Sequence, residues 1–393
     1  MKRLAMLLVL LTLAAPAWST PKKATIDQLK DLLTSLQKAN KTDQETATAI
    51  KQVDLTEELT GSTMQSLGSL IPGPLSTEQI YVLQARSALL PPPPAELPAD
   101  TALDPAAQQA LLAKAQDYVS KAFSQLPSLT ASRMIARFQD SVEAVHTYTG
   151  MNHGTSQDTD PNWQGDDLNI RLVTNITKPV ESQGGLEKPP DTKDKTNWGP
   201  NNLVASVGPL LTLPQVLQEA NASGTLKFLR WELINGKKTA VFSFSVDKKK
   251  TKFSVQYCCF PDTDTAGVLT TGAGIGNPQS GGGAPADGNL QTISEWKPFK
   301  ASAGYRGELF IDPDLGVVVR TITQADFKKS DFVHNESIRT DFGAQSIAGK
   351  TLVVPIQSIT AAEIVPNGAS FAAHYAVRHS FVTQTYSDYK LAQ

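Results

Sequence analysis

The spacing of hydrophobic residues along the chain changes near Pro127. Before it, apolar residues recur every three or four positions, as on one face of a helix. After it, stretches of alternating apolar and polar residues are typical of strands with one buried face. The pattern therefore predicts an α+β fold, with a helical region over residues 20–125 followed by an antiparallel β domain over residues 128–393.

Several local signals indicate where helices begin in the first region. Residues 25–28 and 42–45 read Thr-x-x-Gln and Thr-x-x-Glu, which are capping boxes. Another helix is expected over 76–90, and the Asp-Pro pair at the start of 104–123 favours a further one. The four prolines at 91–94 predict an extended spacer between these last two helices.

The clearest strands are expected at 225–234, 238–246 and 252–257. The first two are joined by Asn235-Gly236, the dipeptide that favours a type I′ hairpin turn. Short connections favour antiparallel pairing, since parallel strands need long crossovers. The three segments are therefore predicted to form one antiparallel meander.

The rest of the β domain shows weaker patterns. A hairpin loop is expected at 312–316, and residues 148–200 and 261–290, rich in glycine, proline and polar residues, are expected to be loop insertions. Additional strands are predicted at 133–145, 304–311, 317–323, 352–359, 361–364 and 375–386, and a short helix at 213–222.

These strands give an expected sheet of roughly seven to nine members, whose apolar face must be hidden. Because strands twist, a sheet with one apolar face curls or is covered by a helix. We therefore expect a curved sheet or incomplete β-barrel wrapped around a helix, with residues 105–123 or 213–222 as the cover.

Composition excludes some classes of protein. The 393 residues include 36 lysines and arginines against 38 aspartates and glutamates, so there is no basic excess of the kind that binds nucleic acid. Two cysteines are too few for a disulfide scaffold.

The first 19 residues predict a secretory signal peptide. Lys2 and Arg3 precede an apolar run over 4–15, and small residues follow at Ala17 and Ser19, after either of which cleavage is expected. The run is too short to cross a hydrocarbon core of about 30 Å. A periplasmic or secreted protein without a transmembrane segment after signal removal is therefore expected.

The only cysteines, Cys258 and Cys259, are adjacent. Neighbouring Cα atoms lie about 3.8 Å apart, below the usual disulfide range, so a bond between these cysteines would be strained. A vicinal disulfide and two free thiols at a strand end both remain open. A redox site is the weaker alternative, since no C-x-x-C spacing is present.

A loop with several acidic residues is a weak calcium candidate, because oxygen ligands at alternate positions suit calcium. Trp163 stands where an EF-hand loop needs glycine, so a solvated loop is the first interpretation. No other metal and no cofactor is expected. The candidate ligands are Asp158, Asp160, Asn162, Asp166 and Asp167.

Aromatic residues gather on one face of the predicted meander. They are Phe228, Phe242, Phe244, Phe253 and Tyr257. The first interpretation is that they form part of the core, because aromatic faces are normally buried. The alternative is that they line a concave sheet that binds a lipid or acyl chain.

The β domain resembles the LolA/LolB-like envelope proteins. The resemblance rests on the leader, the strands over 226–257, the hairpin Gly304–Pro313 and the ending Tyr386–Lys390. It implies an incomplete antiparallel barrel that wraps around a helix and holds acyl chains.

The whole chain is also similar to a set of uncharacterised bacterial exported proteins. The shared features are Asp54-Leu55-Thr56-Glu57-Glu58-Leu59 in the helical region and Leu126-Pro127 before the first long strand. This resemblance implies no activity.

The leading functional hypothesis is non-catalytic binding of a hydrophobic ligand, a lipid or acyl chain, or of a protein partner of the envelope. The first alternative is a structural or interaction protein of the periplasm that docks through its helical region. The second is a hydrolase whose site is assembled from distant residues near His146, His334, His374 or His379.

Overall fold

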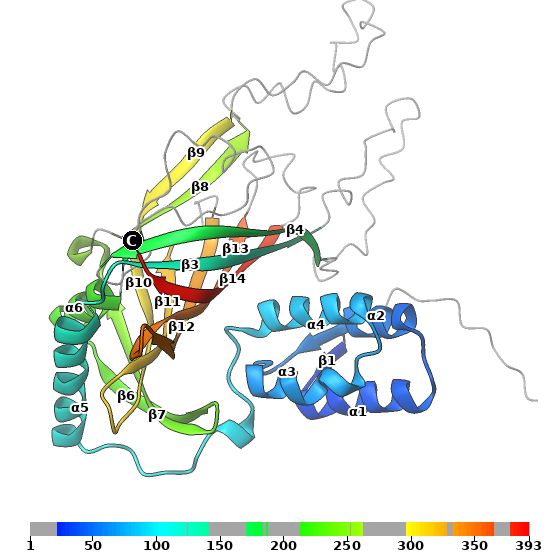
Figure 1. Ribbon diagram of the computed structural model, residues 1–393, viewed down its shortest axis with the longest axis horizontal. Coiled ribbons are helices and arrows are strands. Elements are labelled where there is room, and N and C mark those ends of the chain that lie inside the picture. The colour runs from blue at the N-terminus through cyan, green and yellow to red at the C-terminus, as the bar shows by residue number, and fades with distance from the viewer. Residues whose placement is uncertain are drawn as a thin grey trace, which may run out of the picture.

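The computed structural model of the chain shows an α+β fold, in which a helical unit lies beside a large, curved antiparallel sheet (Figure 1). The sheet does not close into a barrel, which confirms the predicted fold class. The predicted signal peptide lies outside the described residues. Those residues are 22–123, 125–140, 170–183, 186–187, 213–251, 253–261, 296–327, 333–364 and 378–392.

The first part of the chain folds around a core of its own, here called the N-terminal unit (residues 22–90). Leu29, Leu33, Ile50, Leu59 and Ile80 are fully buried in this core. Its elements are β1 (Lys22–Ala24), α1 (Ile26–Lys38), α2 (Asp43–Lys51), β2 (Val53–Leu55), α3 (Gly61–Leu67) and α4 (Pro74–Ser87).

Local capping chemistry fixes the helix starts in this unit. Both predicted capping boxes form, at the starts of α1 and α2. Helix α4 begins two residues earlier than expected, because the Asp43 carboxylate of α2 accepts hydrogen bonds from the backbone N–H groups of Leu75 and Ser76, each at 2.9 Å. The parallel pair β1–β2 was not predicted.

The predicted helical region divides into two parts. After a 3-10 turn, η2 (Pro94–Glu96), the spacer passes the edge of the sheet, where the Thr101 carbonyl accepts a hydrogen bond from Trp231 Nε1 at 2.8 Å. Helix α5 (Pro105–Tyr118), extended by a π turn to Phe123, then packs on the sheet. The Asp-Pro helix start is confirmed, since Asp104 caps α5.

The main sheet has ten strands in the order β5-β4-β3-β14-β13-β12-β11-β10-β7-β6, all antiparallel. The turn at Asn235-Gly236 has positive φ at both residues, as a type I′ turn requires. The strands are β3 (Leu129–Asp140), β4 (Ile170–Gln183), β5 (Leu186–Glu187), β6 (Lys227–Ile234), β7 (Lys237–Val246), β10 (Gly304–Ile311), β11 (Val318–Asp326), β12 (Val333–Ile347), β13 (Lys350–Ile364) and β14 (Arg378–Leu391).

The predicted three-stranded meander is wrong in its third member. Strand β8 (Ser254–Pro261) leaves the main sheet and pairs with β9 (Trp296–Ser302) in a separate two-stranded sheet. Strand β10 takes the free edge of β7, where Phe242 lies opposite Leu309 and both are fully buried. The sequence pattern identified the strands, but pairing was decided by this distant contact.

Three further strands differ from expectation. The segment expected as a loop insertion over 148–200 contains β4, which pairs along the length of β3. The two short strands predicted at 352–359 and 361–364 form one continuous strand, β13. The fifteen-residue β12 was not predicted at all, because charged residues such as Arg339 and Asp341 stand at its buried positions.

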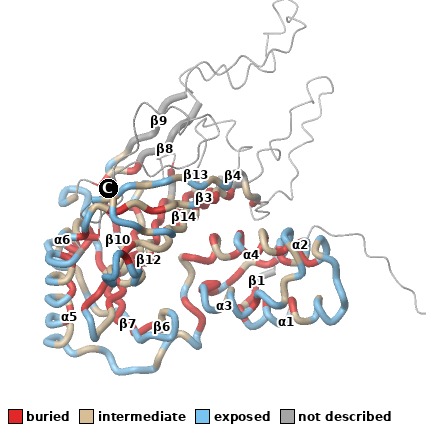
Figure 2. The backbone as a smooth tube through the Cα atoms, in the orientation of Figure 1, coloured by how far each residue is buried: buried red, intermediate tan, exposed pale blue. Residues whose placement is uncertain are grey.

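Side chains on the two faces of the sheet pack against different helices. On the α5–α6 face, Phe242 and Leu309 pack in one core with α5 and α6 (Leu213–Ser223). On the α4 face, Phe138 and Phe381 pack against Val82 of α4. Figure 2 shows the buried residues concentrated in the strands and inside the N-terminal unit.

Gly307, in the middle of β10, generates a prediction about sheet packing. A Cβ at this position would overlap the carbonyl oxygen of Ile322 on β11, a backbone atom that cannot move aside. We expect Gly307→Ala to destabilise the fold by roughly 3 kcal/mol or more, as other strained core substitutions do. Urea denaturation measures this. Gly61→Ala, which meets open space at the start of α3, is the control, and an equal effect of both substitutions would contradict the prediction.

Candidate functional site

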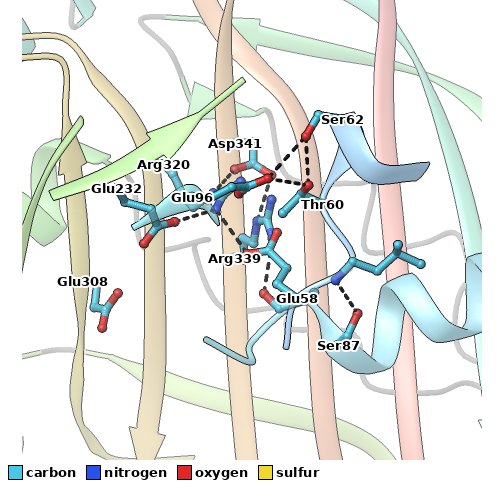
Figure 3. A network of polar contacts seen from close by, with 12 residues as sticks. Glu58, Thr60, Ser62, Ser87, Glu96, Glu232, Glu308, Arg320, Arg339 and Asp341 are labelled. Atoms are coloured by element: carbon cyan, nitrogen blue, oxygen red, sulfur yellow. Dashed lines mark hydrogen bonds and ion pairs between the residues drawn. The ribbon is translucent and has the colours of Figure 1, made fainter. Parts of the chain in front are cut away.

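A buried network of ion pairs joins the N-terminal unit to the α4 face of the sheet (Figure 3). Five charged residues form its centre, and each is at most 9% exposed. They are Glu58 from the segment between β2 and α3, Glu232 of β6, Arg320 of β11, and Arg339 and Asp341 of β12.

Strand register and helix ends bring these residues together. Arg339 and Asp341 are two positions apart on β12 and so point to the same face. Arg320 lies directly opposite Asp341 on the neighbouring strand. Glu58 is held in place by the end of α4, since the Leu59 N–H donates to Ser87 Oγ at 3.0 Å.

The two arginines at the centre bind the same carboxylates. Arg339 Nε donates to Asp341 Oδ2 at 2.9 Å, while its Nη1 donates to Glu58 Oε1 and to the Ala88 carbonyl. Arg320 Nε donates to Asp341 Oδ1, and its Nη1 lies 3.5 Å from Glu58 Oε2. Each carboxylate therefore bridges two guanidinium groups.

The network continues along the edge of the sheet. Arg230 forms ion pairs at 2.8 Å with both Glu232 and Glu308. Arg320 Nη1 lies 3.6 Å from Glu232 Oε1, which connects this outer group to the centre. The Arg230 and Arg320 guanidinium groups both lie over the ring of Phe310, at 5.8 and 5.4 Å from its centroid.

Electrostatics keep the centre charged despite its burial. Burial alone would lower the pKa of Arg339, but the charges of Asp341 and Glu58 outweigh it and raise that pKa. Burial would raise the pKa of Asp341, but Arg339 and Arg320 hold it below its ordinary value. At Glu232, the effect of burial exceeds that of the neighbouring arginines, Arg230 and Arg320, and raises the pKa.

This arrangement is typical of a structural ion-pair network. Arginine stays protonated at neutral pH and cannot serve as a base, and the carboxylates at the centre already accept hydrogen bonds from guanidinium groups. The network therefore fixes the N-terminal unit on the sheet.

A second cluster lies on the α5–α6 face of β12, β13 and β14. Strand register places Glu336, Ala362 and Ser380 in one row across these strands. Glu336 and Ser380 are each 1% exposed. Among the described residues, both carboxyl oxygens of Glu336 lack a hydrogen-bond partner. Within the same part of the chain, the hydroxyl groups of Ser380 and of Ser358 on β13 also lack one.

Unpartnered buried polar groups are uncommon and costly, which makes this row a candidate binding site. Burial raises the pKa of Glu336 to about 8, so its carboxyl group is largely neutral at pH 7. Strand register also places Arg133 and Arg137 of β3 on this face, beyond β14. Burial and the charge of Arg133 lower the pKa of Arg137.

The structure places the sequence-predicted aromatic residues in the packed core. Phe242, Phe244 and Phe253 are buried on the α5–α6 face, and the rings of Phe244 and Phe253 lie 5.8 and 5.3 Å from that of Tyr305. Phe228 packs at the edge, 5.8 Å from Phe242. These contacts favour the core interpretation over the lining of a groove.

Other predicted residues fall where no side-chain contact is described. Cys258 and Cys259 lie in β8, as does Tyr257, and the side chains of all three are outside the described part. The calcium candidates at 158–167 are outside it as well. In the residues that are described, no group of three or more potential metal ligands occurs.

The histidines considered for a hydrolase are not brought together in the described part of the chain. His146 and His374 lie outside it, as does the side chain of His334. His379 is described, and its Nε2 lies 3.9 Å from Glu363 on the α4 face.

The residues of both clusters were missed by sequence analysis. A signal existed at Arg339 and Asp341, because opposite charges two positions apart share one face of a strand. Glu58 follows Glu57 in an acidic pair whose role was not apparent. Glu336 gave no signal, since its burial depends on neighbouring strands.

Comparison with protein-family models, curated proteins and solved structures found no match to the chain. Within the described segments, every helix is too short or too polar to traverse a lipid bilayer.

The ion-pair network predicts a large effect of removing Glu58. Glu58→Gln leaves Arg339 and Arg320 buried with one carboxylate fewer, and breaking a buried pair in this way costs about 3–5 kcal/mol. Urea denaturation of the full chain measures this loss. Asp117→Asn is the control, because it breaks an exposed ion pair with Lys121 and should leave stability unchanged. A small effect of Glu58→Gln would contradict the role assigned to the network.

Glu336 predicts a specific dependence of stability on pH. The folded chain keeps the proton up to about pH 8, whereas the unfolded chain releases it near pH 4.5. The free energy of unfolding should therefore fall between these pH values, by an amount on the order of 5 kcal/mol, and then level off.

Urea denaturation at pH 5, 7 and 9 measures this fall. Glu336→Gln stays neutral and should remove it, while Glu363→Gln, on the opposite face of β13, should keep it. The same pH profile in the wild type and Glu336→Gln would refute the assignment.

Proposed function

We propose that this chain is an exported protein of the bacterial envelope that binds an amphiphilic ligand, a lipid or acyl chain, without catalysing a reaction. The proposed binding surface is the α5–α6 face of the sheet over β11–β14. The N-terminal unit, fixed to the other face, serves as a rigid support.

The supporting observation is a band of buried side chains on this face that lies outside the hydrophobic core containing α5 and α6. Thr323, Ile338, Thr360 and Val382 form one row across β11–β14. Ile338 and Val382 are 7% and 5% exposed, yet neither belongs to any of the three hydrophobic clusters that the described side chains form. A band of branched aliphatic side chains and threonine methyl groups suits an acyl chain.

The open form of the sheet is consistent with this use. Strands β5 and β6 are its edges, and these edges are not paired with each other. A ligand can therefore reach the α5–α6 face without breaking the hydrogen bonds between strands. A closed barrel would have to open first.

The absence of catalysis is inferred from the described charged groups. The central carboxylates of the ion-pair network are bound to arginine. Glu336 is buried, and in the described segments it has no hydrogen-bonded nucleophile or histidine beside it. General acid–base or nucleophilic catalysis requires such a neighbour.

The alternative of a freely docking helical region is less well supported. A docking module on its own linker needs few contacts with the rest of the chain. Here α4 shares a core with the sheet, and Glu58 forms buried ion pairs with two of its strands.

The proposal predicts that the protein carries a ligand and takes up a hydrophobic probe. Mass spectrometry of a solvent extract from the purified native protein should detect an amphiphile. The delipidated protein should increase the fluorescence of 1-N-phenylnaphthylamine. Ala362→Leu, which adds bulk on the binding face, should weaken this binding about tenfold or more.

The control is Glu363→Leu, the neighbouring position on the opposite face of β13, which should leave probe binding unchanged. Thermal unfolding by circular dichroism confirms that both variants fold. An empty extract together with no fluorescence increase would overturn the proposal.

A further inference from the structure

The row of Glu336, Ala362 and Ser380 lies beside the proposed acyl-binding band, on the same face of the same strands. We propose that Glu336 and Ser380 form a head-group subsite that binds an amphiphile carrying a primary ammonium group. This inference rests on the proposed function and adds the chemical class of the ligand.

Strand geometry allows the two residues to contact one small group. Neighbouring strands lie about 4.8 Å apart, so the Cα atoms of Glu336 and Ser380 are separated by about 10 Å. The residue between them, Ala362, has only a methyl side chain, so no larger side chain on the sheet separates the two. The long side chain of Glu336 and the short one of Ser380 point to the same side.

The unpartnered atoms define which chemical group fits. Two carboxyl oxygens of Glu336 and one hydroxyl oxygen of Ser380 are buried and have no hydrogen-bond partner among the described residues. They amount to three acceptors when the carboxyl group is ionised. A primary ammonium group has three N–H donors and no acceptor, as a lysine side chain does.

Charge also favours an ammonium group over the other common lipid head groups. A carboxylate ligand is ionised at neutral pH and has no donor, so it leaves the acceptors of Glu336 and Ser380 unsatisfied. A hydroxyl group offers one donor and leaves two of the acceptors unsatisfied. A buried carboxylate is tolerated when a cation pairs with it, and an ammonium group supplies that cation.

The binding step includes one proton. Near neutral pH the Glu336 carboxyl group is protonated in the free protein, and it must ionise to pair with the ammonium group. The O–H bond of the carboxyl group breaks and the proton passes to the buffer, while the ammonium group keeps its own three protons. Binding is therefore expected to release up to one proton per ligand.

Three probes of equal chain length test the proposal: dodecylamine, dodecanol and lauric acid, each below its micelle concentration. Displacement of 1-N-phenylnaphthylamine from the delipidated full chain gives their affinities at pH 7. The wild type should bind dodecylamine at least tenfold more tightly than dodecanol, and lauric acid most weakly.

Matched variants connect this preference to the subsite. Glu336→Gln should lose the tenfold preference for dodecylamine over dodecanol. Ser380→Ala should reduce dodecylamine affinity two- to fivefold. Glu363→Gln, which removes a carboxylate from the opposite face of β13, should change nothing. Circular dichroism melting confirms that each variant is folded.

Titration calorimetry in two buffers of different ionisation enthalpy gives a second measurement. The wild type should release protons on binding dodecylamine, and Glu336→Gln should not. If the probes bind but the preference for the amine is absent, or survives in Glu336→Gln, the head-group subsite is refuted. If none of the three probes binds, the proposed function fails.

Discussion

The architecture depends on the need to pair charges that are removed from water. Arg320, Arg339 and Asp341 are built into the middle of the sheet, where the N-terminal unit covers them. Unpaired, each would carry a large desolvation penalty, and this buried group on β11 and β12 has two arginines for one aspartate. Glu58 supplies a further carboxylate from the other side of the interface. The buried charges of the sheet are therefore neutralised only when the N-terminal unit is docked correctly. A displaced unit would leave cations uncompensated.

The elements found from the sequence were those specified by short stretches of chain. The capping boxes, the Asn235-Gly236 turn and the Asp104-Pro105 helix start each use neighbouring residues, and each forms as expected. Strand pairing depends on residues far apart in the chain. The partner of β7 is about sixty residues away, and nothing in the alternation of β8 shows that it joins another sheet. For the same reason β12 was missed: its buried charges pair with Arg320 on β11 and with Glu58, which lies 281 residues before Arg339 in the chain.

The buried polar groups on the two faces of the sheet differ in whether they have bonding partners. On the α4 face, the central charged side chains have partners, and the result is a rigid joint. On the α5–α6 face, Glu336, Ser358 and Ser380 are buried and unsatisfied in the described part of the chain. Buried polar atoms that have partners stabilise a fold, whereas buried polar atoms without partners are available to bind a ligand. This contrast is the reason for proposing a ligand site on one face of the sheet and a supporting role for the other.

The path of the spacer has a consequence for solubility. Strand β6 is an edge of the sheet, and an open edge is a template on which a second copy can add a strand. The spacer runs beside this edge, held by Trp231 and by an ion pair between Asp100 and Lys238. It cannot itself extend the sheet easily, because prolines lack the N–H group that a strand must donate. The spacer that connects the two halves of the molecule thus also covers one edge of the sheet and hinders self-assembly into fibrils.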